Sequence, residues 1–143
     1  GMVDALSAYN LLVAGLQHDG EVNTAGWDIN LLDSSPASEK VYRFTTAGDV
    51  KNFTATLVWN RNYESSYPFN FDMDLWNDFK LTLNKINADG SISVVQTSDS
   101  PVDNVEHIYT NLEPKSIYEL TIADSPNSKS KDTSVYAISW QMR

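Results

Sequence analysis

Acidic residues are the first candidates for chemistry in this sequence. Asp72 and Asp74 stand two positions apart in the run FDMDLW, so on a strand both carboxylates project from the same face. Asp78 follows shortly after them. Calcium takes about six to eight oxygen ligands, and acidic loops between strands supply such ligands. The pattern suggests a calcium site at Asp72, Asp74 and Asp78, and a solvated strand face on an acidic protein is the alternative.

Aromatic residues form the second group of candidates. Tyr63, Tyr67 and Phe69 lie in the long segment 61–70, and Trp76 follows just beyond it. Aromatic rings on a loop can stack on sugar rings or dock against a neighbouring domain. The same rings can instead close one end of a hydrophobic core. A planar, solvent-facing platform would favour sugar binding, whereas rings buried under a loop would favour a structural role.

Nucleophilic catalysis finds little support. It needs a serine held against a base that a third group orients. The two histidines are His18, which follows a helical stretch, and His107, which lies within a predicted strand. No serine occupies a glycine-flanked turn between a strand and a helix, and the chain has no cysteine. The sequence therefore predicts a domain without catalytic machinery of its own.

Composition restricts the partners. The chain has 143 residues and a formal net charge of −9. Such a surface repels phosphate backbones, and the sequence has no basic patch interleaved with aromatics, so nucleic acid is not an expected partner. No apolar run approaches the ~20 residues that cross a bilayer, so membrane insertion is not expected. No signal peptide is visible in the first residues.

The acidic and aromatic candidates lie on or between short runs of alternating apolar residues, which are typical of β-strands. These runs predict strands at 41–46, 53–60, 71–76, 79–86, 91–97, 104–110, 116–122 and 134–142. A helix is expected only at 3–17, where Leu6, Tyr9, Val13 and Leu16 recur at helical spacing. This helix would either pack on the strands or be the last helix of a preceding domain. Strands without alternating helices are typical of a sandwich or a barrel, not of a parallel α/β sheet.

One segment of the sequence indicates a particular type of domain. Residues 98–114, SDSPVDNVEHIYTNLEP, resemble a segment of the β-sandwich domain that follows the catalytic domain in many bacterial secreted subtilisin-like serine peptidases. Gly26-Trp27-Asp28 and residues 55–62 (ATLVWNRN) resemble further stretches of that domain, in the same order. Residues 72–75 (DMDL) are similar to a strand of this group and of the broader pre-peptidase C-terminal domains. The run VDALSAYNLL resembles the helix that ends subtilisin-like catalytic domains.

The resemblance implies an all-β fold, a jelly-roll-like antiparallel β-sandwich of about eight strands with one N-terminal helix. Residues 21–143 would form the sandwich, and residues 1–20 the helix, a remnant of a preceding catalytic domain. The implied function is that of a non-catalytic accessory domain, secreted or on the cell surface. Its partner would be a neighbouring peptidase domain, or a protein or polysaccharide surface. A carbohydrate-binding module and a calcium-stabilised adhesion domain are the alternatives.

Overall fold

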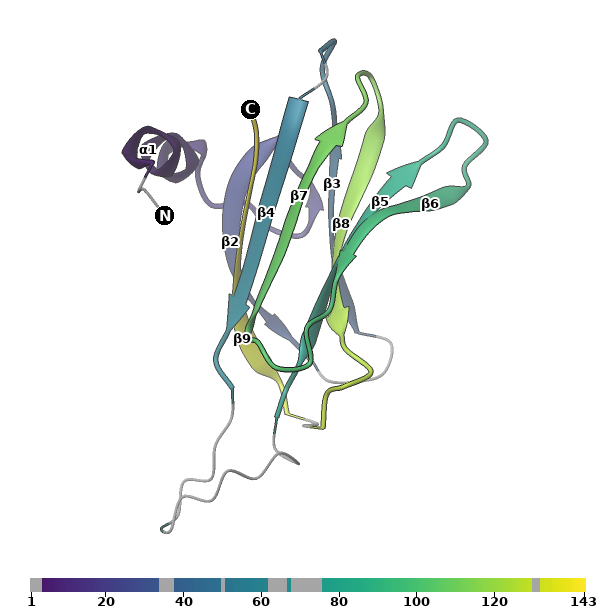
Figure 1. Ribbon diagram of the computed structural model, residues 1–143. Coiled ribbons are helices and arrows are strands. Elements are labelled where there is room, and N and C mark those ends of the chain that lie inside the picture. Colours follow the sequence, from purple (N-terminus) through teal and green to yellow (C-terminus); the bar gives the residue numbers. More distant parts are fainter. Residues whose placement is uncertain (1–3, 34–37, 50, 62–66, 68–75, 130–131) are drawn as a thin grey trace.

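Two β-sheets packed face to face make up the protein (Figure 1). The computed structural model describes residues 4–33, 38–49, 51–61, 67, 76–129 and 132–143. One sheet has five strands in the order β1-β3-β8-β5-β6, and the other has four in the order β2-β9-β4-β7. The elements are α1 (Ala5–Ala14), β1 (Gly20–Glu21), β2 (Ala25–Leu32), β3 (Glu39–Thr45), β4 (Lys51–Trp59), β5 (Phe79–Ile86), β6 (Ile92–Ser98), β7 (Val105–Leu112), β8 (Ile117–Asp124) and β9 (Ser134–Met142). The predicted all-β sandwich with one N-terminal helix is confirmed.

The core lies between the sheets and is rich in aromatic rings. Phe44 of β3 lies 5.1 Å from Phe53 of β4, measured between ring centroids, so the rings join the two sheets. At the other end of the core Trp59 of β4 lies 5.2 Å from Phe79 of β5. All four side chains are buried. Burying a ring of this size contributes roughly 1.5–3 kcal/mol, which is why the alternating apolar runs predicted these strands well.

β2 was missing from the predicted strands because its pattern is inverted. Its inward positions include the buried Asp28 and the half-buried Asn30, whereas Ile29 and Leu31 point outward and are exposed. An alternating apolar run normally marks the face that a strand buries. In β2 the polar residues Asp28 and Asn30 face the core, and Leu32 is the aliphatic residue that the strand buries.

Asp28 is accommodated in the core by hydrogen bonds between the sheets. Its Oδ2 accepts from the Tyr42 hydroxyl at 2.8 Å, and that hydroxyl lies 2.7 Å from the Tyr136 hydroxyl. Tyr42 belongs to the five-stranded sheet, whereas Asp28 and Tyr136 belong to the four-stranded one. Burial raises the pKa of both tyrosines, so both phenols stay protonated at neutral pH. The three side chains therefore connect the two sheets through a buried polar network.

Two further elements differ from the expectation. The two-residue strand β1 pairs with β3 in parallel, so the sandwich is not antiparallel throughout. The predicted strand 71–76 lies mostly outside the described residues, and Trp76 itself is not in a strand. The run Asn-Ala-Asp-Gly at 87–90 is typical of a hairpin turn, and a hairpin is present there between β5 and β6, where Gly90 has a φ of 83°.

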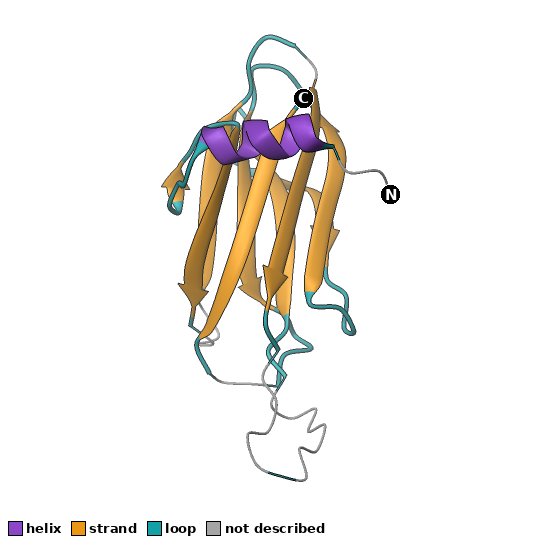
Figure 2. Cartoon of the chain, turned by 90° about the vertical axis from the view of Figure 1, so that its left-hand side faces the viewer, coloured by secondary structure: helices purple, strands orange, loops and turns teal. Residues whose placement is uncertain are grey.

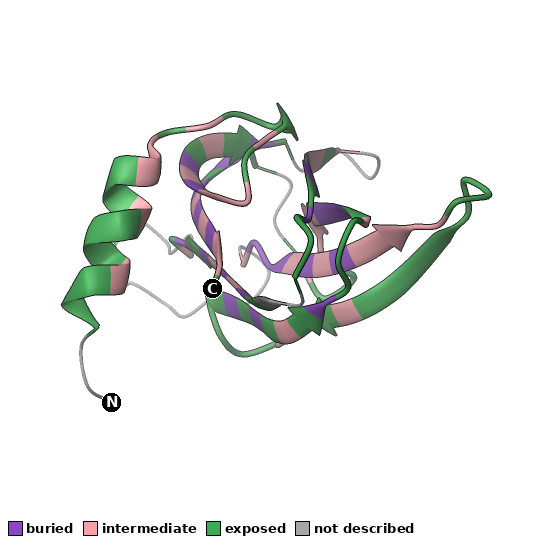
Figure 3. Ribbon diagram, turned by 90° about the horizontal axis from the view of Figure 1, so that it is seen from above, coloured by how far each residue is buried: buried purple, intermediate pink, exposed green. Residues whose placement is uncertain are grey.

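α1 crosses the outer side of the four-stranded sheet near one end (Figure 2). The side chain of Asp4 caps the helix by accepting from the backbone nitrogen of Ser7 at 3.0 Å. The half-buried residues of the helix are Ser7, Leu11 and Ala14, which lie on one side of it. No residue of the helix is buried (Figure 3).

The apolar stripe that predicted α1 therefore does not pack on the sandwich. Leu6, Tyr9 and Val13 of that stripe are 60–70% exposed, as is Leu12, and Leu16, which lies beyond the end of α1, is 50% exposed. The helix rests on the sheet through a small, partly polar side and presents its larger apolar residues to solvent. The helix is shorter than the predicted 3–17 and lies on the sandwich with its less apolar side toward the strands, and its origin as the last helix of a preceding domain stays a prediction.

The cross-sheet network makes a stability prediction. Replacing Tyr42 by Phe removes the hydroxyl that donates to buried Asp28, so we expect the free energy of unfolding to fall by about 1–3 kcal/mol. Tyr136→Phe leaves the bond between Tyr42 and Asp28 in place and should cost about 1 kcal/mol or less. Urea denaturation of both variants measures the difference, and an equal or larger loss for Tyr136→Phe would contradict this account.

Candidate functional site

Most of the candidate residues that the structure describes lie at one end of the sandwich. A cavity of about 240 Å³ is lined there by Trp76, Asp78, Pro101, Pro126, Asn127 and Lys129. Asp78 directly precedes β5, and its backbone is held from the opposite loop. Its carbonyl accepts from the Ser125 nitrogen at 2.8 Å, and its nitrogen donates to the Ser128 hydroxyl at 3.2 Å. A loop far along the chain thus positions Asp78 beside the cavity.

The carboxylate of Asp78 is the most unusual group of this end. The residue is 3% exposed, and neither carboxylate oxygen has a hydrogen bond of normal geometry within the described structure. The nearby Ser125 hydroxyl donates instead to Asp99, at 2.6 Å. Burial raises the pKa of the Asp78 carboxyl to about 6; the charges of Asp99 and Glu106 act in the same direction, and that of Arg61 opposes them.

The predicted calcium site is represented only by Asp78, because Asp72 and Asp74 lie outside the described residues. Among the residues that the structure describes, no three His, Asp or Glu side chains are arranged to hold a metal ion. A buried carboxylate with little hydrogen bonding is the kind of group that a cation satisfies. The calcium site therefore stays a prediction, with one of its three residues in a suitable environment.

The aromatic candidates that the structure describes differ in how exposed they are. Trp76 is half-buried, and the guanidinium carbon of Arg61 lies 4.2 Å from its ring centroid, a cation–π contact that covers one face of the ring. For Trp76 this geometry favours a structural role over a sugar platform. Tyr67 is 86% exposed. Tyr63 and Phe69 lie outside the described residues, so their role as ligand-binding residues stays a prediction.

The segment VDNVEHI has a structural role in the sandwich. The side-chain amide of Asn104 donates to the Trp59 carbonyl at 2.7 Å, and the Trp59 nitrogen donates back to the Asn104 carbonyl at 3.2 Å. Glu106 is 1% exposed and accepts from the Ser98 hydroxyl and from the Ser100 nitrogen, the latter at 2.7 Å. These bonds fasten β6, the loop after it and the start of β7 to one another.

Neither histidine side chain contacts a serine hydroxyl in the described part of the chain. His107 lies exposed on β7 with its Nδ1 2.8 Å from the Thr56 hydroxyl. His18 Nδ1 lies 3.5 Å from Oδ1 of the buried Asp28. Both contacts join residues of neighbouring strands or loops, and neither has the arrangement of a nucleophile, a base and an orienting group.

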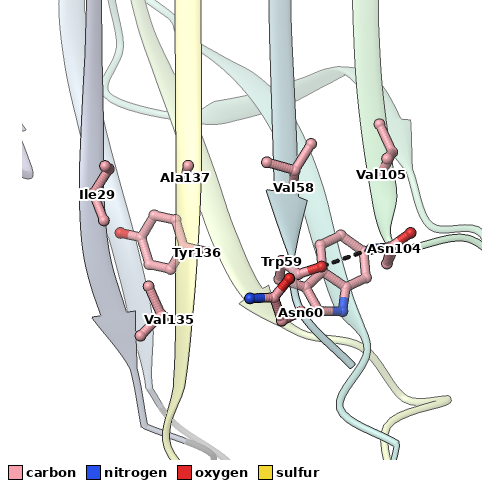
Figure 4. Close-up of a pocket in the computed structure, with 9 residues that line it drawn as sticks. All are labelled: Ile29, Val58, Trp59, Asn60, Asn104, Val105, Val135, Tyr136 and Ala137. Atoms are coloured by element: carbon pink, nitrogen blue, oxygen red, sulfur yellow. Dashed lines mark hydrogen bonds between the residues drawn. The ribbon is translucent and has the colours of Figure 1, made fainter. Parts of the chain in front are cut away.

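A second region was not predicted from the sequence. Pairing of the four-stranded sheet aligns Ile29 of β2 with Ala137 of β9, then Val58 of β4 and Val105 of β7. These four outward side chains, the apolar row, cross the whole sheet (Figure 4). A pocket of about 380 Å³ lies over them, lined by Ile29, Val58, Trp59, Asn60, Asn104, Val105, Val135, Tyr136 and Ala137. The alternation of Trp27, Ile29 and Leu31 was the one local signal of this region.

Comparison with known proteins identifies the fold. No protein-family model matches the chain, and no curated protein matches its sequence. The pre-peptidase C-terminal domain of a collagenase from Bacillus anthracis superposes with a TM-score of 0.57, over 87% of this chain and 96% of that one, at 13% identity. CorA, a surface-associated copper-binding protein of Methylomicrobium album BG8, gives a TM-score of 0.52 over 88% and 99%, at 5% identity. Such identities establish similarity of fold alone.

The raised pKa of Asp78 makes a prediction about pH. The unfolded chain has the ordinary carboxyl pKa of 3.8, so between about pH 4 and 6 only the folded protein keeps this proton. The stability that the protonated carboxyl contributes is therefore complete below pH ~4 and is lost as the pH rises through about 6. The loss amounts to roughly 1–3 kcal/mol, from ~1.4 kcal/mol for each unit of pKa.

Asp78→Asn should remove this dependence. We expect the variant to gain stability relative to the natural chain between about pH 4 and pH 7.5, because an amide carries no charge to bury. Urea denaturation at the two pH values measures the gain. Asp49→Asn, a substitution of an exposed carboxylate, is the control and should show none. A constant difference between Asp78→Asn and the natural chain at both pH values would disprove the assignment.

Proposed function

The chain is a pre-peptidase C-terminal-like β-sandwich in its fold, and we propose that it serves as a non-catalytic accessory domain of a secreted or cell-surface subtilisin-like serine peptidase. In this role it stabilises the peptidase, assists its folding or secretion, or positions it on a protein or polysaccharide surface. The observation that carries the proposal is the segment 98–114, whose residues resemble those of the β-sandwich that follows such catalytic domains.

The positions of the resembling residues support this assignment. Gly26 of the run Gly26-Trp27-Asp28 lies against Trp140, so that a Cβ there would come within 2.9 Å of the indole. Asp28 enters the network between the sheets, and Asn104 pairs with Trp59. All of these residues hold the sandwich together. A resemblance made of such residues favours a shared domain type over a shared chemical site.

The net charge and the hydrophobicity of the chain agree with the partners that this function implies. A net charge of −9 does not favour nucleic acid or an anionic membrane surface. Within the described residues, no helix is long and apolar enough to cross a membrane. The nearest partner in this proposal is a peptidase domain in the same polypeptide.

An antibody raised against this chain tests the proposal. It should precipitate, from the culture medium or cell surface of the source organism, a polypeptide that a fluorophosphonate reagent labels, because subtilisin-like peptidases carry a reactive serine. The isolated 143-residue chain should remain unlabelled and should leave casein intact. A precipitated polypeptide without a fluorophosphonate-reactive serine would refute the peptidase context, and labelling of the isolated chain would refute the non-catalytic role.

A calcium-stabilised adhesion domain is the second candidate, favoured by the buried carboxylate of Asp78. If Asp72, Asp74 and Asp78 hold a calcium ion, millimolar calcium should raise Tm, because a ligand bound only by the folded state stabilises it. Asp78→Asn should abolish this rise, whereas Asp49→Asn should preserve it. A Tm that is the same in calcium and in chelator would remove this candidate and would leave the accessory role untouched.

A further inference from the structure

The outward strand positions of the four-stranded sheet, all of them within the described residues, carry no formal charge. Each of its strands turns four residues outward, and none of them is Asp, Glu, Lys or Arg. These residues are Ala25, Trp27, Ile29 and Leu31 of β2, Val135, Ala137, Ser139 and Gln141 of β9, Asn52, Thr54, Thr56 and Val58 of β4, and Val105, His107, Tyr109 and Asn111 of β7. The chain has 19 acidic and 10 basic residues, so charges have been kept off this face.

The other sheet shows the usual arrangement. Its outer side carries Glu39, Arg43, Lys80 and Glu119, with a salt bridge between Arg43 and Glu119. Solvated sheet faces of soluble proteins commonly carry such charges, which oppose association. A face that lacks them is suited to burial against an uncharged surface.

Exposed apolar groups lie at both ends of the uncharged face. At one end α1 crosses the strands (Figure 2), and its apolar residues Leu6, Tyr9, Leu12 and Val13 are exposed. At the other end the apolar row lies bare beneath its pocket (Figure 4). Leu31 and Val135, paired with each other, extend the row and are also exposed. Contiguous apolar surface of this kind marks an interaction site in soluble proteins.

We propose that this face is the contact between two copies of the chain in a symmetric dimer. The face is self-complementary, since it has a raised apolar helix at one end and an uncovered apolar row at the other. A two-fold axis in the plane of the contact, perpendicular to the strands, reverses the ends of the second copy. Each α1 then lies over the apolar row of its partner, which gives an isologous contact.

The charge distribution favours a second copy as the occupant. The strand surfaces of two copies can meet without burying a charge that lacks a partner, which would cost several kcal/mol, because the charged Asp4 and Arg143 beside α1 already pair with each other. The strands and helix offer on the order of twenty residues a side, at the lower end of the ~20–30 of a stable interface. The net charge of −9 on each copy lies outside the contact and repels. Salt screens that repulsion, so association should strengthen as salt is added.

Sedimentation velocity over a range of concentrations tests the dimer. We expect a reversible monomer–dimer equilibrium with a lower Kd at ~0.5 M than at ~0.1 M sodium chloride. Val58→Lys places a charge at the centre of the apolar row and should raise the Kd about tenfold or more. Val94→Lys, at a valine 66% exposed on β6 of the other sheet, is the matched control and should leave Kd unchanged. Equal Tm values and circular dichroism spectra of both variants establish that they fold.

Cross-linking tests the reversed arrangement. The chain has no cysteine, so Leu12→Cys and Val58→Cys each provide a single thiol. In a mixture of the two variants, a short bis-maleimide should join Leu12→Cys to Val58→Cys more often than it joins either variant to itself. A monomer at every concentration, a dimer indifferent to Val58→Lys, or preferential same-site cross-links would overturn the proposal. A monomer would leave the face to a different protein and would not bear on the peptidase context.

Discussion

The buried carboxylate of Asp28 is the constraint on which the rest of the structure depends. It lies in the core between two sheets, where an unpaired charge would be costly, and the Tyr42 hydroxyl from the opposite sheet donates to it. The Tyr136 hydroxyl extends the network within 2.7 Å of that donor. A hydrogen bond between the sheets that forms only when they meet in one position specifies their packing more narrowly than apolar side chains do. Because side chains alternate along a strand, an inward Asp28 also turns Ile29 and Leu31 outward. The same residue therefore fixes the core and exposes the aliphatic face.

A second connection between the sheets lies at the opposite edge of the sandwich. Glu106 of β7 is buried and accepts from the Ser98 hydroxyl of β6, and these strands belong to different sheets. Asn104 and Trp59 exchange hydrogen bonds between the loop before β7 and the end of β4. The segment that most resembles a known domain thus consists of residues that close the sandwich. This explains why a resemblance can identify a fold while leaving the function to other surfaces.

Two surfaces of opposite character remain for that function. One end of the sandwich gathers carboxylates around Asp78, where burial raises the pKa to about 6. The outer face of the four-stranded sheet has no charged side chain at its outward positions and carries an apolar row. A cation suits the first surface, and an uncharged protein surface suits the second.

The sequence alone determined the elements whose signals are local. Alternating apolar residues predicted β5 and β9 with their observed bounds, helical spacing over 3–17 predicted α1, and the turn sequence of residues 87–90 indicated a hairpin. Each of these depends on neighbours within a few positions, which periodicity and turn chemistry describe. Asp78 could likewise be named as a candidate, although its burial depends on Ser125 and Ser128 far along the chain.

Only the tertiary structure decided which side of an element faces the core. The apolar residues of α1 predicted a helix but not that they would point away from the sheet. The apolar row joins four strands whose residues lie far apart in the sequence, and strand register alone brings them into line. The periodicity of a sequence shows which residues share one face of an element. It does not show whether that face points into the core, because this depends on long-range partners such as Tyr42 for Asp28.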